Sequence, residues 1–269
     1  MSDADIYSSS TLFHLRGTQV ASMQDEFGTV AVIDNRDFRS MSFDLIFEQS
    51  KMLKSNAALP VHHYVRAMLM ARTLVKAQHI LLLGLGGGSL LRSLYAGNPH
   101  IVVDVVELRQ AVLRVAQDYF CLPQSDNVRY FIDDAARFIA GQNSQRGYQL
   151  IFSDLYNANA LAPLQATEQF LRNCAARLQP GGWLVLNHPQ LPQQAPPFSQ
   201  ALLAIFCSLF YTVAPSGNVV IFASRSPCPH PLHHLQRLMS SSGEDFTTDF
   251  TSLAQKLSRW PGSSVTLKR

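Results

Sequence analysis

The chain has 269 residues, of which 47% are hydrophobic and 15% charged, and its formal net charge is +3. This composition supplies apolar material for one large or two modest domains and excludes a disordered chain. The small charge and the scattered lysines and arginines argue against a nucleic-acid partner. The longest apolar runs, such as residues 80–83, are too short to cross a membrane.

The first residues and the cysteines indicate the cellular compartment in which the protein is expected. Residues 1–5 are acidic where a secretory signal needs positive charge, and the four cysteines show no CxxC spacing. We therefore expect a cytoplasmic protein without a membrane partner. Its cysteines are expected to be reduced and to serve as small buried hydrophobic residues.

Residues 1–56 are predicted to form a small antiparallel β domain. Strand-like runs cover residues 28–33 and 40–47, and the turn sequence at residues 34–37 separates them. A unit of two or three strands buries little on its own. We therefore expect it to dock on the following domain or on a second copy of the chain.

Residues 57–225 alternate between helix and strand and are predicted to form a Rossmann-like cofactor-binding domain. Apolar strands separated by helices indicate a mostly parallel sheet covered on both faces. A closing hairpin with an antiparallel last strand is typical of the α/β fold of S-adenosylmethionine-dependent methyltransferases. The predicted helices cover residues 61–75, 90–95, 110–120, 135–140, 167–178 and 197–210. The predicted strands cover residues 79–83, 101–106, 128–132, 149–152, 183–186, 211–213 and 218–223.

Residues 226–269 form a Pro/His-containing tail, with short helices predicted over residues 232–239 and 250–259. Cys228 and the nearby histidines at positions 230, 233 and 234 match no zinc spacing. We predict no metal site and a solvated tail that packs on the domain.

The strongest functional signal is a glycine-rich loop at residues 84–88, between a predicted strand and a predicted helix. Glycines let the backbone turn sharply and approach a ligand, and the helix start offers free N–H groups. Ser89 stands where a dinucleotide GxGxxG motif needs its third glycine. Gly84, Gly86 and Gly88 fit the GxGxG form, which favours an adenosyl cofactor over a plain tight turn.

Acidic residues follow each of the next strands. Glu107 ends the second strand, about twenty residues after the loop, where a carboxylate can accept both hydroxyls of a ribose. Asp133, Asp134 and Ala135 follow the third strand and could bind an adenine amino group, although one aspartate could instead cap the next helix. Asp154 ends the fourth strand, where it could orient or deprotonate an amine or simply cap a loop.

These signals, in this order, resemble the spermidine synthase (polyamine aminopropyltransferase) family. The resemblance runs from about residue 28 to residue 224. In that family, the enzyme moves an aminopropyl group from decarboxylated S-adenosylmethionine to putrescine, usually as a homodimer or tetramer. The matching segments are residues 47–50, 83–90, 105–108, 133–135, 148–154 and 214–217.

The resemblance implies a role for each matching position. The loop at Gly84 and Gly86 would support the cofactor, Glu107 would hold its ribose, and Asp134 would hold its adenine. Gln49, in the gate segment, would approach the thioether end of the ligand. Asp154 would position and deprotonate the attacking amine of a small-molecule substrate, and no metal would be required. Homodimerisation would use the N-terminal β unit.

The chain also departs from the family pattern at four positions. Gly87 stands where the family has an aspartate for the cofactor's amine, and Asn157 replaces an acid of the amine site. Ala214 and Phe47 stand where the family has tyrosines. A dication needs carboxylates and hydroxyls that accept from ammonium groups. The substrate contact at Asn157 is therefore expected to suit an amine other than putrescine.

Three functions remain open at this point. The first is an aminopropyltransferase-like enzyme with Asp154 as the base. The second is a methyltransferase that uses intact S-adenosylmethionine, because Gly87 would tolerate the carboxylate that an aspartate would repel. The third is a catalytically inactive nucleoside-binding protein.

Overall fold

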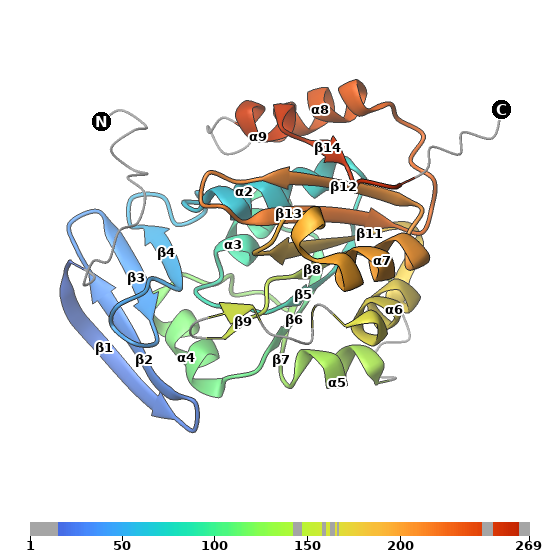
Figure 1. Cartoon of the computed structure of the whole chain (residues 1–269). Helices are drawn as coiled ribbons and strands as arrows, with labels where there is room; N and C mark the ends of the chain where they lie inside the picture. The colour runs from blue at the N-terminus through green and yellow to red at the C-terminus, as the bar shows by residue number, and fades with distance from the viewer. Residues whose placement is uncertain are drawn as a thin grey trace.

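The computed structural model describes residues 16–141, 147–157, 160–161, 165, 167–243 and 250–263. Of residues 156–157, 160–161 and 192 it describes the backbone alone. Two larger sheets organise the described chain: a four-stranded antiparallel sheet at the N-terminal end and an eight-stranded sheet at the centre. Figure 1 shows the small sheet, in blue, at one side of the central sheet and its helices.

The N-terminal unit has four strands in chain order rather than the two or three expected. They are β1 (Thr18–Asp25), β2 (Gly28–Asp34), β3 (Phe38–Ser42) and β4 (Ser50–Leu53). The predicted strand over residues 40–47 is wrong beyond Ser42. There, Asp44 Oδ1 accepts hydrogen bonds from the backbone N–H groups of Ile46 and Phe47, at 2.9 and 2.8 Å. This local capping turns the chain before β4 begins.

The central sheet confirms the predicted fold class. Strands β5, β6, β7, β8 and β11 are parallel, whereas β13 runs antiparallel to β11 and pairs with β12 in a hairpin. The strand order is β14-β12-β13-β11-β8-β5-β6-β7. The bounds are β5 His79–Leu83, β6 Val102–Glu107, β7 Val128–Ile132, β8 Tyr148–Ser153, β11 Leu178–His188, β12 Ser208–Val213 and β13 Val219–Ser224. The two-residue strands β9 (Tyr156–Asn157) and β10 (Ala160–Leu161) pair apart from it.

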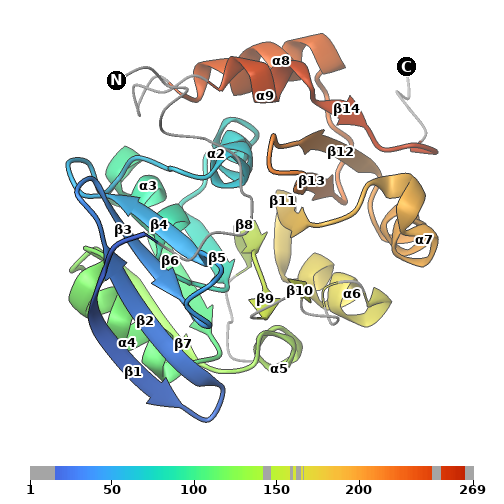
Figure 2. The ribbon, with the colours of Figure 1, turned by 60° about the vertical axis from the view of Figure 1, so that its left-hand side comes forward.

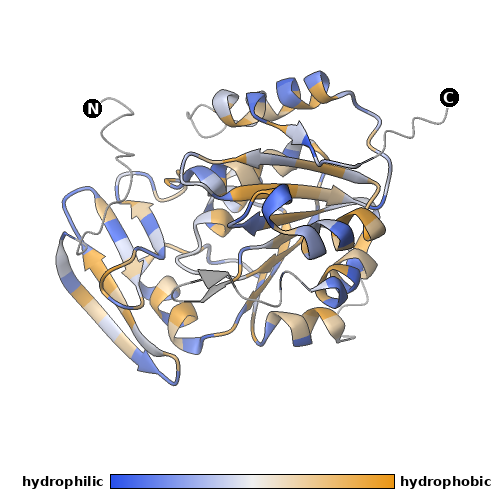
Figure 3. Ribbon diagram, viewed as in Figure 1, coloured by the Kyte–Doolittle hydropathy of each residue, from blue (hydrophilic) through white to orange (hydrophobic). Residues whose placement is uncertain are grey.

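Helices cover both faces of this sheet. Side chains of α2, α3 and α4 share one apolar cluster with the N-terminal sheet, whereas those of α5, α6 and α7 share a second cluster on the other face. Figure 3 shows the apolar residues concentrated on the central strands and the inner faces of the helices. The bounds are α2 His63–Leu69, η1 Met70–Thr73, α3 Ser89–Gly97, α4 Gln110–Tyr119, α5 Ala135–Ala140, α6 Glu168–Arg177, η3 Pro192–Gln194 and α7 Pro196–Ile205.

Two helix predictions need correction. The helix expected over residues 197–210 ends at Ile205, because the following apolar residues form β12 and pair with β13. The helix expected over residues 61–75 is shorter and continues as the 3₁₀ turn η1. In both places the apolar residues fit the spacing of more than one kind of secondary structure. Strand pairing or packing then determines which one forms.

The C-terminal segment packs over one end of the central sheet (Figure 2). It contains α8 (Leu232–Ser241), α9 (Thr251–Gln255) and β14 (Ser258–Arg259). The helix predicted over residues 250–259 is therefore wrong in its second half, where β14 pairs with β12. Phe250 and Trp260 are buried, and Thr212 Oγ1 donates to the Leu253 carbonyl at 2.7 Å. Part of the expected solvated tail therefore belongs to the core.

The four cysteines are free thiols, but only Cys174 is buried. Cys121 and Cys207 are exposed, so the expectation of buried hydrophobic cysteines is wrong for these two. Within the described ranges, no helix has the length and apolar character needed to cross a membrane.

Candidate functional site

The glycine loop connects β5 to α3 and adopts a backbone that only glycine accepts readily. The φ angles of Gly84, Gly86 and Gly88 are +93°, +52° and +72°. A Cβ at Gly84 would overlap the backbone carbonyl oxygen of Asp154 and lie 3.0 Å from its carbon. The loop therefore lies directly against the end of β8.

The Gly87 peptide is clamped from two sides. Its N–H donates to Ser50 Oγ at 2.8 Å, which ties the loop to the first residue of β4. Its carbonyl accepts from Arg92, which also donates to the carbonyls of Phe120 and Ala57 at 2.9 and 2.6 Å. Burial lowers the pKa of the Arg92 guanidinium to about 10. Backbone carbonyls thus solvate a buried cation that fixes the loop.

Glu107 ends β6 beside the loop. Its two carboxylate oxygens accept from the backbone N–H groups of Leu85 at 3.0 Å and Arg109 at 2.9 Å. Burial raises the pKa of Glu107, and these hydrogen bonds only partly offset the increase. Arg109 also donates to Asp25 Oδ1 at 2.7 Å and to the Gly28 carbonyl at 2.9 Å. The N-terminal sheet is thereby attached next to Glu107.

The two aspartates after β7 have different partners. Asp134 is the N-cap of α5 and accepts from Arg137 N at 2.9 Å, so the helix-capping alternative holds for this residue. Asp133 forms an ion pair with the Arg137 side chain. Its backbone N–H donates to the Glu107 carbonyl at 3.1 Å. Ala135 begins α5 and is buried.

Two exposed apolar side chains beside these acids were missed by sequence reasoning. Leu108 directly follows β6 and is 43% exposed, while Ile132 ends β7 and is 40% exposed. Glu107 and Ile132 are register partners, so Leu108 and Ile132 lie at neighbouring strand ends. Exposed apolar residues at that edge of an open α/β sheet are a signal for a ring-shaped ligand.

Asp154 is the acid at the end of β8. Its Oδ1 accepts from Asn187 Nδ2 at 2.8 Å, and Tyr64 also hydrogen-bonds to its side chain. Burial raises the pKa of Asp154, while these two hydrogen bonds act in the opposite direction. Asn187 in turn accepts from Asn218 Nδ2 at 3.0 Å. Tyr64 in α2, Asn187 in β11 and Asn218 in the hairpin were not anticipated from the sequence.

The gate segment between β3 and β4 lies next to the loop through Ser50. The backbone N–H of Gln49 donates to the Met41 carbonyl at 2.9 Å, and its side chain is half-buried. Phe47 is 52% exposed. The backbone of Asn157 belongs to β9, but its side chain lies outside the described part of the structure. The predicted substrate contact at Asn157 therefore stays a prediction.

The structure thus places Gly84, Gly86, Gly88, Glu107 and Asp154 around the carboxyl ends of β5, β6 and β8. Asp133 lies one strand further along this edge. Among the described residues, no group of three or more His, Cys, Asp or Glu side chains is arranged to hold a metal. The sheet order, the antiparallel β13 and the glycine loop define a Rossmann-type protein of the S-adenosylmethionine-dependent methyltransferase-like class.

Comparison with known proteins shows which members of this class the chain is similar to. A polyamine aminopropyltransferase from Vibrio vulnificus is 26% identical over 266 residues, covering 94% of this chain and 85% of the relative. The human eEF1A lysine and N-terminal methyltransferase is 28% identical over 144 residues, covering 47% of this chain and 20% of the relative. No protein-family model matches the chain.

The structural neighbours agree with the first relative. A probable spermidine synthase from Corynebacterium glutamicum superposes with a TM-score of 0.71 at 18% identity, covering 82% of this chain and 86% of that one. A spermidine synthase in complex with the transition-state analogue AdoDATO superposes with a TM-score of 0.61 at 16% identity, covering 77% and 74%. The chain is therefore similar to a polyamine aminopropyltransferase over nearly its whole length, and it shares the fold of the spermidine synthases.

Proposed function

We propose that this protein transfers an aminopropyl group from decarboxylated S-adenosylmethionine to a small-molecule amine. The observation that carries this proposal is Asp154, a half-buried carboxylate with a raised pKa at the carboxyl edge of the sheet. The polyamine aminopropyltransferase relative and the spermidine synthase structure with AdoDATO support the same reaction class.

The remaining residues fit the nucleoside part of such a co-substrate. The Glu107 carboxylate can accept from the two ribose hydroxyls, with the N–H of Leu85 fixing its direction. Leu108 and Ile132 would offer apolar surface to the adenine ring, and Asp133 or Asp134 would accept from its amino group. Asp134 Oδ1 caps α5 and Asp133 Oδ1 pairs with the Arg137 side chain, so the second carboxylate oxygen of either aspartate would make the adenine contact. Gln49 would lie toward the thioether end.

For aminopropyl transfer, the protein must align the amine and accept its proton. The amine nitrogen would form a bond to the carbon next to the sulfonium while the carbon–sulfur bond breaks, releasing methylthioadenosine. Asp154 would accept the proton of the amine, and Tyr64 and Asn187 would hold its carboxylate in place. A raised pKa brings Asp154 closer to the pH at which a base is most effective.

The test is a coupled assay of methylthioadenosine release with decarboxylated S-adenosylmethionine and a panel of mono-, di- and polyamines. Asp154→Asn should lower kcat by about 10²–10⁴-fold, as expected for loss of a general base, with methylthioadenosine affinity unchanged. Asp118→Asn, an exposed aspartate on α4, is the matched control and should retain activity. Undiminished turnover by Asp154→Asn, or no turnover with any amine, would contradict the proposal.

A second candidate, methyl transfer from intact S-adenosylmethionine, has its own structural observation. Gly87 presents no carboxylate toward the ligand, so nothing at this loop position repels the carboxylate of the intact cofactor. Parallel calorimetric titration with the intact and decarboxylated cofactors separates the two functions. Tighter binding of the intact cofactor would favour methyl transfer.

We also propose that the protein acts as a homodimer in the cytoplasm, joined through the N-terminal sheet. Val20 and Phe27, on the β1–β2 hairpin, are exposed apolar side chains that such a contact would cover. Sedimentation equilibrium of the wild type and of Phe27→Ser tests this assembly, which the variant should weaken.

A further inference from the structure

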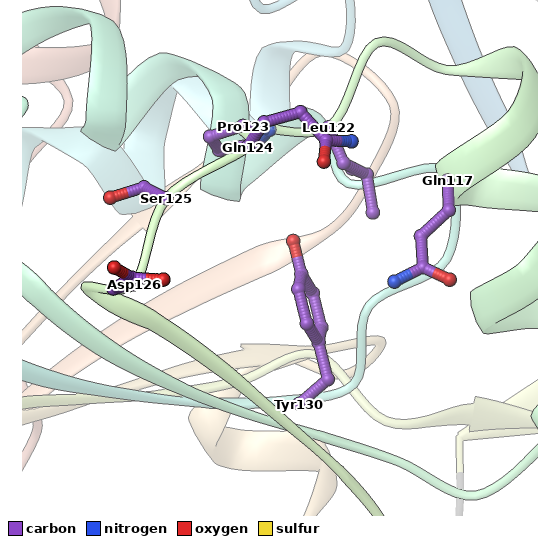
Figure 4. A pocket seen from close by; sticks show the side chains of 7 residues that line it. All are labelled: Gln117, Leu122, Pro123, Gln124, Ser125, Asp126 and Tyr130. Atoms are coloured by element: carbon purple, nitrogen blue, oxygen red, sulfur yellow. The ribbon is translucent and has the colours of Figure 1, made fainter.

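A polar hollow lies on the α4 side of the central sheet, between the end of α4, the loop that follows it, and β7 (Figure 4). Its volume is about 400 Å³. Its walls include Gln117, Leu122, Gln124, Asp126 and Tyr130. None of the glycine-loop residues, Glu107 or Asp154 line it, so it is separate from the candidate active site.

Tyr130 gives this hollow a polar group without a partner. The tyrosine rises from β7 with its hydroxyl toward the loop that contains Leu122 and Ser125 (Figure 4). That hydroxyl oxygen is shielded from solvent and has no hydrogen-bond partner within the described ranges. Burial raises the pKa of Tyr130 to about 12, so the hydroxyl is a neutral donor and acceptor. A buried hydroxyl left unpaired costs free energy that a ligand can recover.

The charge of the lining selects the kind of ligand. Asp126 is the one acidic side chain in the lining, which contains no lysine, arginine or histidine, and it makes no ion pair with any residue that the structure describes. The side-chain amides of Gln117 and Gln124 add neutral groups that can both accept and donate. A carboxylate in a lining without a basic side chain favours a donor-rich cation, and a primary ammonium supplies three N–H donors.

The same loop also contacts the glycine loop. Leu122 packs so closely on Gly88 that a Cβ at Gly88 would overlap its Cδ2 atom. Two residues earlier, the Phe120 carbonyl accepts from Arg92 at 2.9 Å, and Arg92 also holds the Gly87 carbonyl. A ligand that shifts Leu122 therefore acts on the backbone of the cofactor loop.

We propose that this hollow is a second binding site, specific for a small primary ammonium compound, whose occupancy changes the affinity of the glycine loop for its nucleoside. The ammonium group lies against Asp126, and a small movement of the Tyr130 side chain brings its shielded hydroxyl to a second polar group of the ligand. By reciprocity, nucleoside binding changes the affinity of the hollow by the same factor.

The first experiment titrates ¹⁵N-labelled protein with ethanolammonium and follows backbone amide shifts. Saturable shifts should appear at residues 122–126 and 130, and they should persist in Asp154→Asn, which separates this site from the acceptor site. Asp126→Asn should weaken binding about tenfold, because it removes a charge-assisted hydrogen bond. Tyr130→Phe should weaken it less, and Asp118→Asn, the matched surface control, should leave it unchanged.

The second experiment measures the Kd of methylthioadenosine with and without ethanolammonium. The wild type and Asp118→Asn should show a shift that Asp126→Asn loses. Absence of saturable shifts, or shifts that survive both Asp126→Asn and Tyr130→Phe, would overturn the site. Saturable binding without any change in the methylthioadenosine Kd would overturn the coupling. If methylthioadenosine does not bind at all, the proposed nucleoside function fails while the first experiment still decides the hollow.

Discussion

Gly84 offers a direct test of the contact between the cofactor loop and Asp154. Its φ angle is +93°, and a Cβ there would overlap the carbonyl oxygen of Asp154. Gly217, in the turn of the β12–β13 hairpin, has nearly the same φ of +90° but nothing within 4 Å of its added Cβ. The pair Gly84→Ala and Gly217→Ala therefore shares the backbone strain and differs in the clash.

The two substitutions should differ in magnitude. Placing alanine at a positive φ costs about 1–2 kcal/mol, and this applies to both positions. The overlap at Gly84 involves backbone rather than a flexible side chain, so relief requires movement of the strand ends. Overpacking of this kind adds about 1–3 kcal/mol, which gives about 2–5 kcal/mol in total for Gly84→Ala.

Urea unfolding of both variants measures these free energies, and calorimetric titration with methylthioadenosine reports on the site. Gly84→Ala should lose more stability than Gly217→Ala and should also weaken methylthioadenosine binding, because the loop and Asp154 cannot both keep their positions. Equal losses of stability in the two variants would refute the contact as the reason for glycine at position 84.

Two further predictions test the proposed adenine contact and the pKa of Asp154. Ile132→Ser should weaken methylthioadenosine binding about tenfold, the loss expected for one apolar contact, with little change in Tm. Leu203→Ser, a similarly exposed control on α7, should leave binding unchanged. Equal affinities of the two variants would rule out the adenine contact. Burial raises the pKa of Asp154 above its ordinary 3.8, so the folded state binds the proton more tightly and loses stability as the pH rises through that window. The free-energy difference between Asp154→Asn and the wild type, measured by urea unfolding over a pH series, should therefore grow in favour of Asn from pH 3.8 upward and then level off; a difference that stays constant or shrinks would contradict a raised pKa.

The parallel core of the fold was predictable because its strands are short, apolar runs between helical patterns. The run at residues 79–83 has no other reasonable interpretation, and β5 covers these residues. The N-terminal sheet was harder to predict. The turn at residues 43–49 depends on hydrogen bonds from Ser42 and to Asp44, and β1 is a mostly exposed strand with a weak apolar pattern. The pairing of β14 with β12 is a tertiary contact between short segments, for which the local sequence gives no signal.

Some residues of the candidate site were also predictable from the sequence, and others were not. Gly84 and Glu107 are recognisable from local spacing, because the loop and the next strand end belong to one strand–helix–strand unit. The partners of Asp154 come from α2 and β11, as far as 90 residues away in sequence, and Asn218 in the β12–β13 hairpin donates to Asn187. Tyrosine and asparagine at such positions carry no periodicity or motif. Only the tertiary fold brings Tyr64 and Asn187 to one carboxylate.

The glycine at position 87 gains a structural explanation from the packing around it. A Cβ at Gly87 would lie 2.8 Å from Ser50 Cβ and 3.0 Å from the Phe120 ring, so neighbouring side chains fill the space that an acidic residue would need. Ser50 also accepts the Gly87 N–H, and Arg92 holds the Gly87 carbonyl. The missing acid is therefore not an isolated change: β4, α3 and the end of α4 are all packed for a glycine. Aspartate could enter this loop only if Ser50 and Phe120 changed as well, which makes the absence of a carboxylate at the loop a property of the whole site.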